Sequence, residues 1–333
     1  MKAIFLCEKE KTVNNVYAQH VKARIKEEIG LDERVYSRSD VMASPESFCD
    51  TEFIFSTWGM PSFTEDEIKT CFPSLRCVFY AAGTVQSFAR PFLNRGVKVF
   101  SAWAANGVPV AEYTVSQIIL ANKGFFVQTR LMAEKRLDEA KKRKASCIGN
   151  YGERIGLIGC GMIGSLVAKM LQDYDLEVLV FDPFLSDERA AELKVKRVSL
   201  DELFASCRVV SNHLANNEKT KGMLKYSHFS SMPPYATFIN TGRGAQVVED
   251  DLCRALSERD DLTAILDVTY PEPAPLSHPF YTLENCFMTP HIAGSLGGEV
   301  VRMAEYMADE FERYVSGTDC RYEVSIKMLE TMA

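Results

Sequence analysis

One ten-residue stretch, Ile155–Gly164, constrains the fold of this chain more than any other part of it. It reads IGLIGCGMIG, a short apolar run suited to a buried strand followed by three glycines at the spacing G-x-G-x-x-G. Apolar side chains then recur at helical spacing, and a second apolar run, residues 176–181, ends at Asp182. A strand, a glycine turn, a helix and a second strand that ends in an acid predict a βαβ unit that binds a dinucleotide.

Each residue of this pattern has a physical reason. Gly159 permits a tight turn, Gly161 lets a pyrophosphate approach the backbone, and Gly164 lets the helix pack closely against the strand. The N-terminus of the helix then faces the phosphate charge. Asp182 can accept hydrogen bonds from the ribose hydroxyls, which favours NAD over NADP. Without the strand, the helix and the acid, the glycines would indicate only a flexible turn.

The composition narrows the class of protein and its partners. The 333 residues suggest two domains, and 47% apolar with 25% charged residues is typical of a soluble globular protein. The net charge of −7 argues against nucleic acid or an anionic membrane as a partner. The N-terminus lacks the apolar run of a signal peptide, and no window reaches the ~18 apolar residues of a membrane helix. The ten cysteines have no metal-binding spacing, which predicts a cytoplasmic protein without a metal. The basic run KKRK, residues 141–144, is interpreted as a solvated helix face.

Alternating strand and helix patterns predict an α/β protein with two doubly wound parallel sheets. We expect a Rossmann NAD-binding domain, residues 106–299, inserted in a flavodoxin-like substrate domain, residues 1–105 plus 300–333. The strands expected in the substrate domain are 3–7, 34–36, 52–56, 76–80 and 97–100, with helices at 16–29, 65–71 and 299–315. The six strands expected in the NAD-binding domain are 155–158, 176–181, 208–211, 236–239, 264–268 and 286–289.

A long apolar helical stretch connects the two predicted domains. It is expected to begin near Pro109 and to continue to Leu131. Such a stretch is too long and too apolar for one surface helix of a monomer. It therefore favours a homodimer formed through a dimerisation segment, residues 108–145. The alternative is a helix buried between the two domains.

Three successive predicted strands in the second half of the chain are followed by charged side chains. Arg243 follows the first strand, Asp267 and then Glu272 follow the second, and His291 follows the third. The ends of parallel strands open at one edge of the sheet, beside the dinucleotide. This set suits hydride transfer to an anionic 2-oxo acid. Arg243 would pair with the substrate carboxylate and polarise its carbonyl, and His291 would exchange a proton. Glu272 would orient the imidazole, and Asp267 would hold the nicotinamide carboxamide.

Each of these side chains taken alone has a plainer explanation. A strand-end arginine is usually part of a surface ion pair, and a lone histidine is usually structural. The remaining histidines are assigned to that structural class: His20, His213, His228 and His278. In the first half of the chain, the loop Ala81–Thr84 follows the fourth predicted strand. It could bind an anion through backbone N–H groups, or it could be only a tight turn.

The whole chain resembles the D-isomer-specific 2-hydroxyacid dehydrogenase family, most strongly from Asn106 to Gly294. The motifs that carry the resemblance are NGVPVAEYT (106–114), GCGMIG (159–164), INTGRG (239–244), LDVTYPEP (266–273) and TPHIAG (289–294). The resemblance implies an NAD-dependent oxidoreductase that acts on a small 2-oxo acid or its D-2-hydroxy acid, with Arg243, Glu272 and His291 as catalytic residues. It places cofactor contacts at Gly159, Gly161, Met162, Ile163, Gly164, Asp182, Leu214, Ala215, Thr220, Thr241, Gly242 and Asp267. It places substrate contacts at Ala82, Gly83 and Arg243.

Two segments depart from the pattern of this family. The segment after His213, Leu214–Lys219, lacks the usual apolar, proline-containing sequence, and Gly83 is followed by Thr84 rather than by an aspartate. The family also includes corepressors with the same triad, and formate and phosphite dehydrogenases share its fold. The alternatives are therefore a dinucleotide-sensing binding protein and an enzyme that oxidises formate or phosphite.

Overall fold

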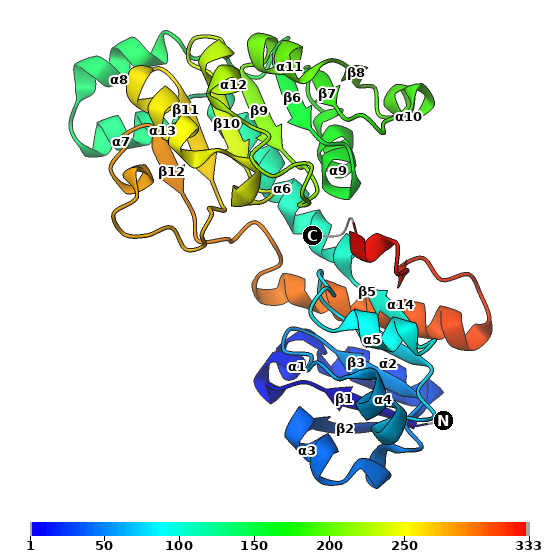
Figure 1. The fold of residues 1–333 in the computed structure, drawn as a ribbon. Helices are drawn as coiled ribbons and strands as arrows, with labels where there is room; N and C mark the ends of the chain where they lie inside the picture. Colours follow the sequence, from blue (N-terminus) through cyan, green and yellow to red (C-terminus); the bar gives the residue numbers. More distant parts are fainter. Residues whose placement is uncertain (1, 331–333) are drawn as a thin grey trace. The chain divides into compact units, whose positions relative to one another are not determined.

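The computed structural model describes residues 2–330, which divide into two compact units. The first unit contains the chain up to Asn106 and from Ser295 onward, and the second unit is Gly107–Gly294. Each unit is an α/β sandwich with a mainly parallel sheet between helices (Figure 1). The sequence placed the two domain boundaries at 105/106 and 299/300, so Asn106 and residues 295–299 belong to the first unit instead of the second.

The sheet of the first unit has the strand order β13-β5-β4-β3-β1-β2. Its neighbours are parallel except for β13, which pairs antiparallel with β5. The strands are β1 Lys2–Leu6, β2 Gly30–Tyr36, β3 Phe53–Ser56, β4 Cys77–Tyr80, β5 Lys98–Ser101 and β13 Glu323–Val324. The helices are α1 Glu10–Val16, α2 Gln19–Glu28, α3 Arg38–Ala43, α4 Glu65–Cys71, α5 Ala89–Asn94 and α14 Val300–Ser316.

Both faces of this sheet are buried, which explains why its strands are apolar throughout. Successive side chains of a strand point to opposite faces, so Phe5 belongs to one core and Ile4 to the other. The core of Phe5 includes residues of α1, α2 and α14, and the core of Ile4 includes residues of α3, α4 and α5. Helix α14 therefore returns the end of the chain to the first unit, as the sequence predicted.

The sheet of the second unit is parallel throughout, with the order β12-β11-β10-β9-β6-β7-β8. From β6 the chain builds outward to β8 and then crosses to β9, which creates a topological switch point between β6 and β9. The strands are β6 Arg154–Ile158, β7 Glu177–Phe181, β8 Lys196–Arg197, β9 Val209–Asn212, β10 Thr237–Asn240, β11 Thr263–Leu266 and β12 Cys286–Met288. The helices are α7 Phe125–Ala133, α8 Leu137–Lys144, α9 Met162–Leu171, α10 Asp187–Glu192, α11 Leu200–Ser206, α12 Tyr226–Ser231 and α13 Glu249–Glu258.

Three expectations about these elements were wrong. The helix expected at 16–29 is α2, which begins only at Gln19, because Tyr17 lies between α1 and α2 with its side chain fully buried and its hydroxyl donating to the carbonyls of Ser56 and Phe79. The second sheet has seven strands rather than six, because the two-residue strand β8 pairs with β7. The connecting helix α6, Trp103–Asn122, begins before Pro109 and contains it, because alanines and valines on both sides of the proline are buried and continue the helix.

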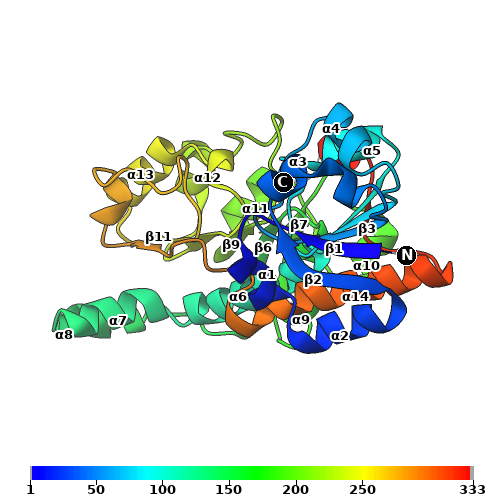
Figure 2. The same cartoon turned by 90° about the horizontal axis from the view of Figure 1, so that it is seen from below.

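The chain passes from the first unit to the second within helix α6. The later part of α6 packs in the core of the second unit. Ala111, Val115 and Ile118 belong to the same apolar cluster as strands β6 and β7. Helices α7 and α8 follow α6 and lie side by side in both views (Figures 1 and 2). None of the helices among residues 2–330 is long and apolar enough to cross a membrane.

Candidate active site

Three loops of the second unit bring the predicted catalytic residues to one edge of the sheet. Strands β10, β11 and β12 are parallel neighbours, so their carboxyl ends open at the same edge. Arg243 follows β10, Glu272 follows β11 and His291 follows β12. Glu272 is hydrogen-bonded to His291, and its carboxylate acts electrostatically on Arg243, so the structure groups the three side chains.

His291 and Glu272 form a hydrogen-bonded pair. Nδ1 of His291 is 2.6 Å from Oε1 of Glu272, and both side chains are partly exposed. The backbone of His291 has a left-handed φ of +54°, and its N–H donates to the carbonyls of Asp267 and Thr289. With Nδ1 bonded to the carboxylate, Nε2 is the ring nitrogen that remains for proton exchange.

Asp267 holds the loop that carries His291. Its side chain is 3% exposed, and Oδ1 accepts hydrogen bonds from the Thr289 hydroxyl at 2.6 Å and from the Ile292 N–H at 2.8 Å. Oδ2 accepts the Ala293 N–H at 2.9 Å. The sequence had assigned Asp267 only to a cofactor contact, whereas these bonds show that it also fixes the loop 289–293.

Arg243 lies on a tightly bonded turn. Its Nη1 donates to the carbonyl of Gly242 at 2.8 Å, and its backbone N–H donates to Oε1 of Gln246 at 3.2 Å. Burial lowers the pKa of the Arg243 guanidinium, while the Glu272 carboxylate acts in the opposite direction. The charge is nevertheless retained near neutral pH, because the ordinary pKa of arginine is far higher. A partly buried guanidinium suits the recognition of a carboxylate.

The three glycines of the fingerprint meet the requirements of a dinucleotide loop. Gly159 has a φ of +89°, and a Cβ there would lie 2.8 Å from the carbonyl oxygen of His213. A Cβ on Gly164 would lie 2.1 Å from the carbonyl oxygen of Gly159, so only glycine permits the close packing of α9. Gly161 precedes α9 and has no described atom within 4 Å of the Cβ position, which leaves its backbone open to a pyrophosphate. The loop therefore fits the cofactor that the sequence predicted.

Asp182 lies beside this loop. Its Oδ2 accepts the N–H of Cys160 at 2.7 Å, and its Oδ1 accepts the N–H of Phe184 at 2.8 Å. Each carboxylate oxygen has a second lone pair, which can still accept a ribose hydroxyl. The predicted contacts Met162 and Ile163 form the start of α9, directly after Gly161.

The other predicted cofactor residues form two turns at the ends of β9 and β10. In the first turn, the Thr220 hydroxyl donates to the carbonyl of Ala215 at 2.6 Å, so it closes the loop that begins at Leu214. In the second turn, the Thr241 hydroxyl is 3.2 Å from the Thr114 hydroxyl of α6. Both turns lie at the same sheet edge as the glycine loop, since β6, β9 and β10 are parallel neighbours.

The predicted carboxylate loop lies in the first unit, after β4. Hydroxyl groups bind its carbonyls: Thr57 donates to Ala81 at 2.8 Å, and Ser101 donates to Ala82 at 3.0 Å and to Gly83 at 2.6 Å. The N–H of Ala82 donates to Tyr80 at 2.9 Å and is therefore already used. The N–H of Gly83 has no acceptor among residues 2–330 and is the better donor for an anion.

Sequence reasoning missed several residues at the edge that carries the triad. His213 was assigned to the structural class, but both of its ring nitrogens are buried without a hydrogen-bond partner among the described residues. Burial lowers the pKa of His213 to about 4, so its ring is neutral at neutral pH. Asn212 and Gln246 are also buried at this edge. Their position could have indicated that these residues lie near the cofactor loop, because Asn212 and His213 stand at the end of β9, next to the fingerprint strand β6.

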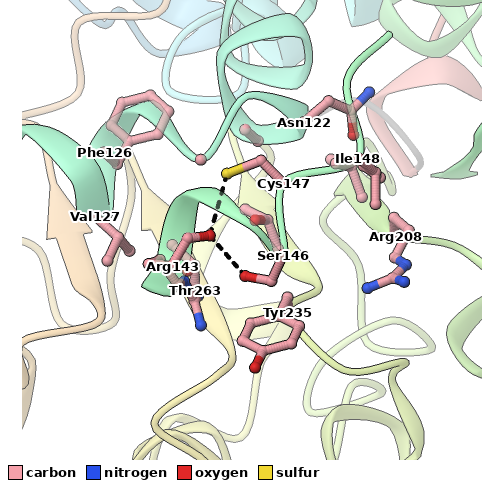
Figure 3. A pocket seen from close by; sticks show the side chains of 14 residues that line it. Asn122, Phe126, Val127, Arg143, Ser146, Cys147, Ile148, Arg208, Tyr235 and Thr263 are labelled. Carbon is pink, nitrogen blue, oxygen red and sulfur yellow. Dashed lines mark hydrogen bonds between the residues drawn. The ribbon is translucent and has the colours of Figure 1, made fainter. Parts of the chain in front are cut away.

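A small cavity lies at the amino ends of strands β9, β10 and β11, opposite the carboxyl ends that carry the triad (Figure 3). Its volume is about 30 Å³, which is the size of one water molecule and too small for a cofactor. Arg143 lines it, donates to the carbonyl of Asp261 at 2.7 Å and lies 4.6 Å from the ring centroid of Tyr235. The prediction that the run 141–144 is a fully solvated face is therefore wrong at Arg143, because this side chain packs against Tyr235.

The chain is similar to several curated proteins that are named as dehydrogenases. It is 30% identical over 236 residues to the D-3-phosphoglycerate dehydrogenase of Archaeoglobus fulgidus, covering 71% of this chain and 44% of that one. It is 32% identical over 232 residues to the formate dehydrogenase of Neurospora crassa, covering 67% of this chain and 62% of that one. The chain thus spans about half of the length of these curated relatives.

Solved structures show the same fold over nearly the whole chain. The apo D-mandelate dehydrogenase of Rhodotorula graminis matches with a TM-score of 0.81 at 18% identity, covering 97% of both chains. A phosphoglycerate oxidoreductase from Rhizobium etli matches with a TM-score of 0.80 at 19% identity, covering 98% of this chain and 99% of that one. The sequence also matches the family described as "D-isomer specific 2-hydroxyacid dehydrogenase, NAD binding domain" over residues 115–293. Since this match covers more than half of the chain, the protein belongs to the D-isomer specific 2-hydroxyacid dehydrogenase family.

Proposed function

We propose that this protein is an NAD-dependent oxidoreductase that transfers a hydride between NADH and a small 2-oxo acid, whose reduced form is the D-2-hydroxy acid. The observation that carries the proposal is the pair of His291 and Glu272, whose ring nitrogen and carboxylate oxygen are 2.6 Å apart. The Glu272 carboxylate also acts on Arg243, and all three residues lie in the same unit as the glycine loop. A histidine with a carboxylate partner and a nearby guanidinium suits a substrate that needs both a proton and an anion site.

The side chains divide the work of the reaction. When bound, NADH supplies the hydride that the carbonyl carbon receives. Protonated His291 donates its Nε2 proton to the carbonyl oxygen during reduction, and the neutral ring accepts it back during oxidation. Arg243 binds the substrate carboxylate through its planar fork and stabilises negative charge that develops on the oxygen. In the first unit, the N–H of Gly83 can donate to an anion.

Oxidation of formate is the second candidate, because the chain is 32% identical to a formate dehydrogenase over 232 residues. Formate loses only a hydride when it becomes carbon dioxide, so this reaction needs no proton acceptor. The proton exchange that the pair of His291 and Glu272 can support is needed in the first reaction and not in the second.

Two measurements test this proposal. NADH consumption with a panel of 2-oxo acids, beside NAD reduction with formate, identifies the substrate class. For the 2-oxo acid reaction we expect Glu272→Gln to lower kcat/KM, because Oε1 of Glu272 bonds Nδ1 of His291 and holds the ring with Nε2 available for proton exchange. Activity with formate alone, or a kcat/KM that Glu272→Gln leaves unchanged, would contradict the proposed role of the pair.

We further propose a cytoplasmic homodimer formed through residues 108–145. The exposed apolar surface that supports a dimer is smaller than the sequence suggested, because the later part of α6 is buried in the core of the second unit. It comes from α7 and α8, where Phe125, Met132 and Leu137 are 45%, 55% and 59% exposed. The cytoplasmic location agrees with ten unpaired cysteines. Light scattering at micromolar concentration tests the assembly, and a monomer mass would contradict it.

A further inference from the structure

Three buried amide side chains connect the two turns that are expected to hold cofactor and substrate. Asn212 ends β9, Asn240 ends β10, and Gln246 lies three residues after Arg243. Their exposed fractions are 0%, 1% and 0%. A buried amide is costly unless its donors and acceptors are bonded, so the partners of these groups are informative.

The cluster is held together by the amide of Asn212. Its Nδ2 donates to Oε1 of Gln246 at 2.6 Å and to Oδ1 of Asn240 at 3.0 Å. The two N–H bonds of one amide group therefore serve two different acceptors. The three side chains form a single network at the carboxyl edge of the sheet.

One side of the network holds the turn after β9. Gln246 donates from Nε2 to the carbonyl of Leu214 at 2.7 Å, and Asn212 accepts the N–H of Leu214 at Oδ1, at 3.3 Å. Both backbone polar groups of Leu214 are thus bound by amide side chains. Leu214 and Ala215 were predicted to contact the cofactor.

The other side of the network holds the turn that carries Arg243. Oε1 of Gln246 accepts the N–H of Arg243 at 3.2 Å. Asn240 accepts the N–H of Gly242 at 3.1 Å and donates to the carbonyl of Arg243 at 3.2 Å. A Cβ on Gly242 would lie 2.8 Å from Oε1 of Gln246, so the turn also packs directly against the network.

We propose that Gln246 is a positioning residue that fixes the cofactor turn at Leu214 relative to the turn of Arg243, with Asn212 and Asn240 each supporting one side. This inference rests on the proposed dehydrogenase function. The argument is geometric, because one amide group of Gln246 binds both turns. Hydride transfer depends on the distance between cofactor and substrate, and a displacement of about 1 Å costs on the order of 10²-fold in rate.

The network predicts a different defect for each of its three members. Asn212→Leu frees the N–H of Leu214 and removes both bonds that hold the cluster together, so it is expected to weaken NADH binding about fivefold, with a smaller rise in the KM of the 2-oxo acid. Asn240→Leu releases the turn of Arg243 and is expected to do the reverse. Gln246→Met keeps the approximate volume but removes both sets of bonds, and it is expected to weaken NADH binding and lower kcat by about tenfold each.

The experiment measures NADH binding by fluorescence titration, steady-state kinetics and thermal stability for each variant. Asn285→Leu is the matched control, since Asn285 is a buried amide of the same unit that donates to the carbonyls of Leu256 and Arg259. We expect the control to lose stability without a change in NADH affinity or kcat. Gln246→Asn, which stays polar but is too short to bridge the two turns, repeats the test if the methionine variant folds poorly.

Two outcomes separate this inference from the proposed function. A folded Gln246 variant that is less stable but binds NADH and turns over normally would show that the network is only structural and would overturn the inference. Failure of the unmodified protein to bind NADH, or to act on any 2-oxo acid, would overturn the proposed function instead.

Discussion

The two units have the same architecture but opposite hydrogen-bonding chemistry at the carboxyl ends of their strands. In the first unit, the hydroxyls of Thr57 and Ser101 donate to loop carbonyls at Ala81, Ala82 and Gly83. Binding the carbonyls leaves a backbone N–H of this loop, at Gly83, free to bind an anion.

In the second unit the side chains at the strand ends mainly accept hydrogen bonds. Asp182 accepts the N–H groups of Cys160 and Phe184, and Asp267 accepts those of Ile292 and Ala293. The backbone donors at these four positions are therefore used, and recognition of the substrate is left to side chains such as Arg243 and His291. The comparison shows that two sheets of similar topology can leave different backbone groups free for a ligand. Which groups remain free depends on the side chains at the ends of the strands.

The largest effect is expected from removing the reactive group of the second unit. His291→Gln leaves an amide that cannot exchange a proton near neutral pH, so kcat is expected to fall about 10²- to 10⁴-fold. Stability should change little, because the imidazole is partly exposed. Steady-state kinetics in both directions checks this, with NADH titration as the control for an intact cofactor site. Activity within tenfold of the unmodified protein would remove His291 from the chemistry.

The second effect concerns the anion site of the second unit. Arg243→Gln removes the charge and the fork, and we expect kcat/KM to fall about 10²-fold, as when an oxyanion donor is lost. Arg243→Lys should recover part of this loss, because the charge remains while the bidentate geometry does not. Kinetics of both variants with the preferred 2-oxo acid provides the measurement. Equal defects in the two variants would mean that geometry, and not charge, is the contribution of Arg243.

A smaller effect is expected from the first unit. Ser101→Ala removes two bonds to the carbonyls of Ala82 and Gly83, so the loop is held less firmly. We expect the KM of the 2-oxo acid to rise about five- to tenfold. NADH affinity should not change, because the glycine loop belongs to the other unit. Thr70→Ala, which removes a hydroxyl–carbonyl bond on α4, is the control. A rise in the Kd of NADH instead would contradict the assignment of the carboxylate loop to the first unit and of cofactor binding to the second.

Local patterns in the sequence predicted much of this arrangement. Helix α4 has the bounds that were expected, because Thr64 and Glu67 form a capping box at its start. The glycine fingerprint specified its own turn, since the close contacts at Gly159 and Gly164 leave no room for another residue. The grouping of Arg243, Glu272 and His291 followed from the parallel order of three successive strands.

The features that the sequence did not predict depend on partners that are distant along the chain. Gln246 binds Leu214, 32 positions away, and nothing near either residue indicates this bond. Tyr17 ends a helix because its hydroxyl reaches β3 and β4. Helix α6 continues through Pro109 because apolar packing on both sides outweighs the lost backbone bond.

The last effect concerns stability rather than activity, and it tests one acceptor of the second unit by pH. Glu249 accepts the N–H of Tyr270 at 2.8 Å, and burial raises its pKa to about 7, with a further increase from neighbouring Asp250. Nε2 of His278 lies 3.4 Å from its other oxygen. A carboxyl whose pKa is higher in the folded chain than in the unfolded one binds a proton more strongly when folded. The resulting stabilisation is fully present below about pH 4.5 and is lost as pH rises through 7.

Glu249→Gln keeps an acceptor for Tyr270 but does not ionise, so it lacks this dependence on pH. We expect the free energy of unfolding of the unmodified protein, relative to this variant, to fall by about 2 kcal/mol between pH 5 and pH 7.5, following the linkage of roughly 1.4 kcal/mol per pKa unit. Urea unfolding of both proteins at several pH values provides the comparison. A difference that stays constant or grows with pH would show that Glu249 is ionised throughout as the partner of His278.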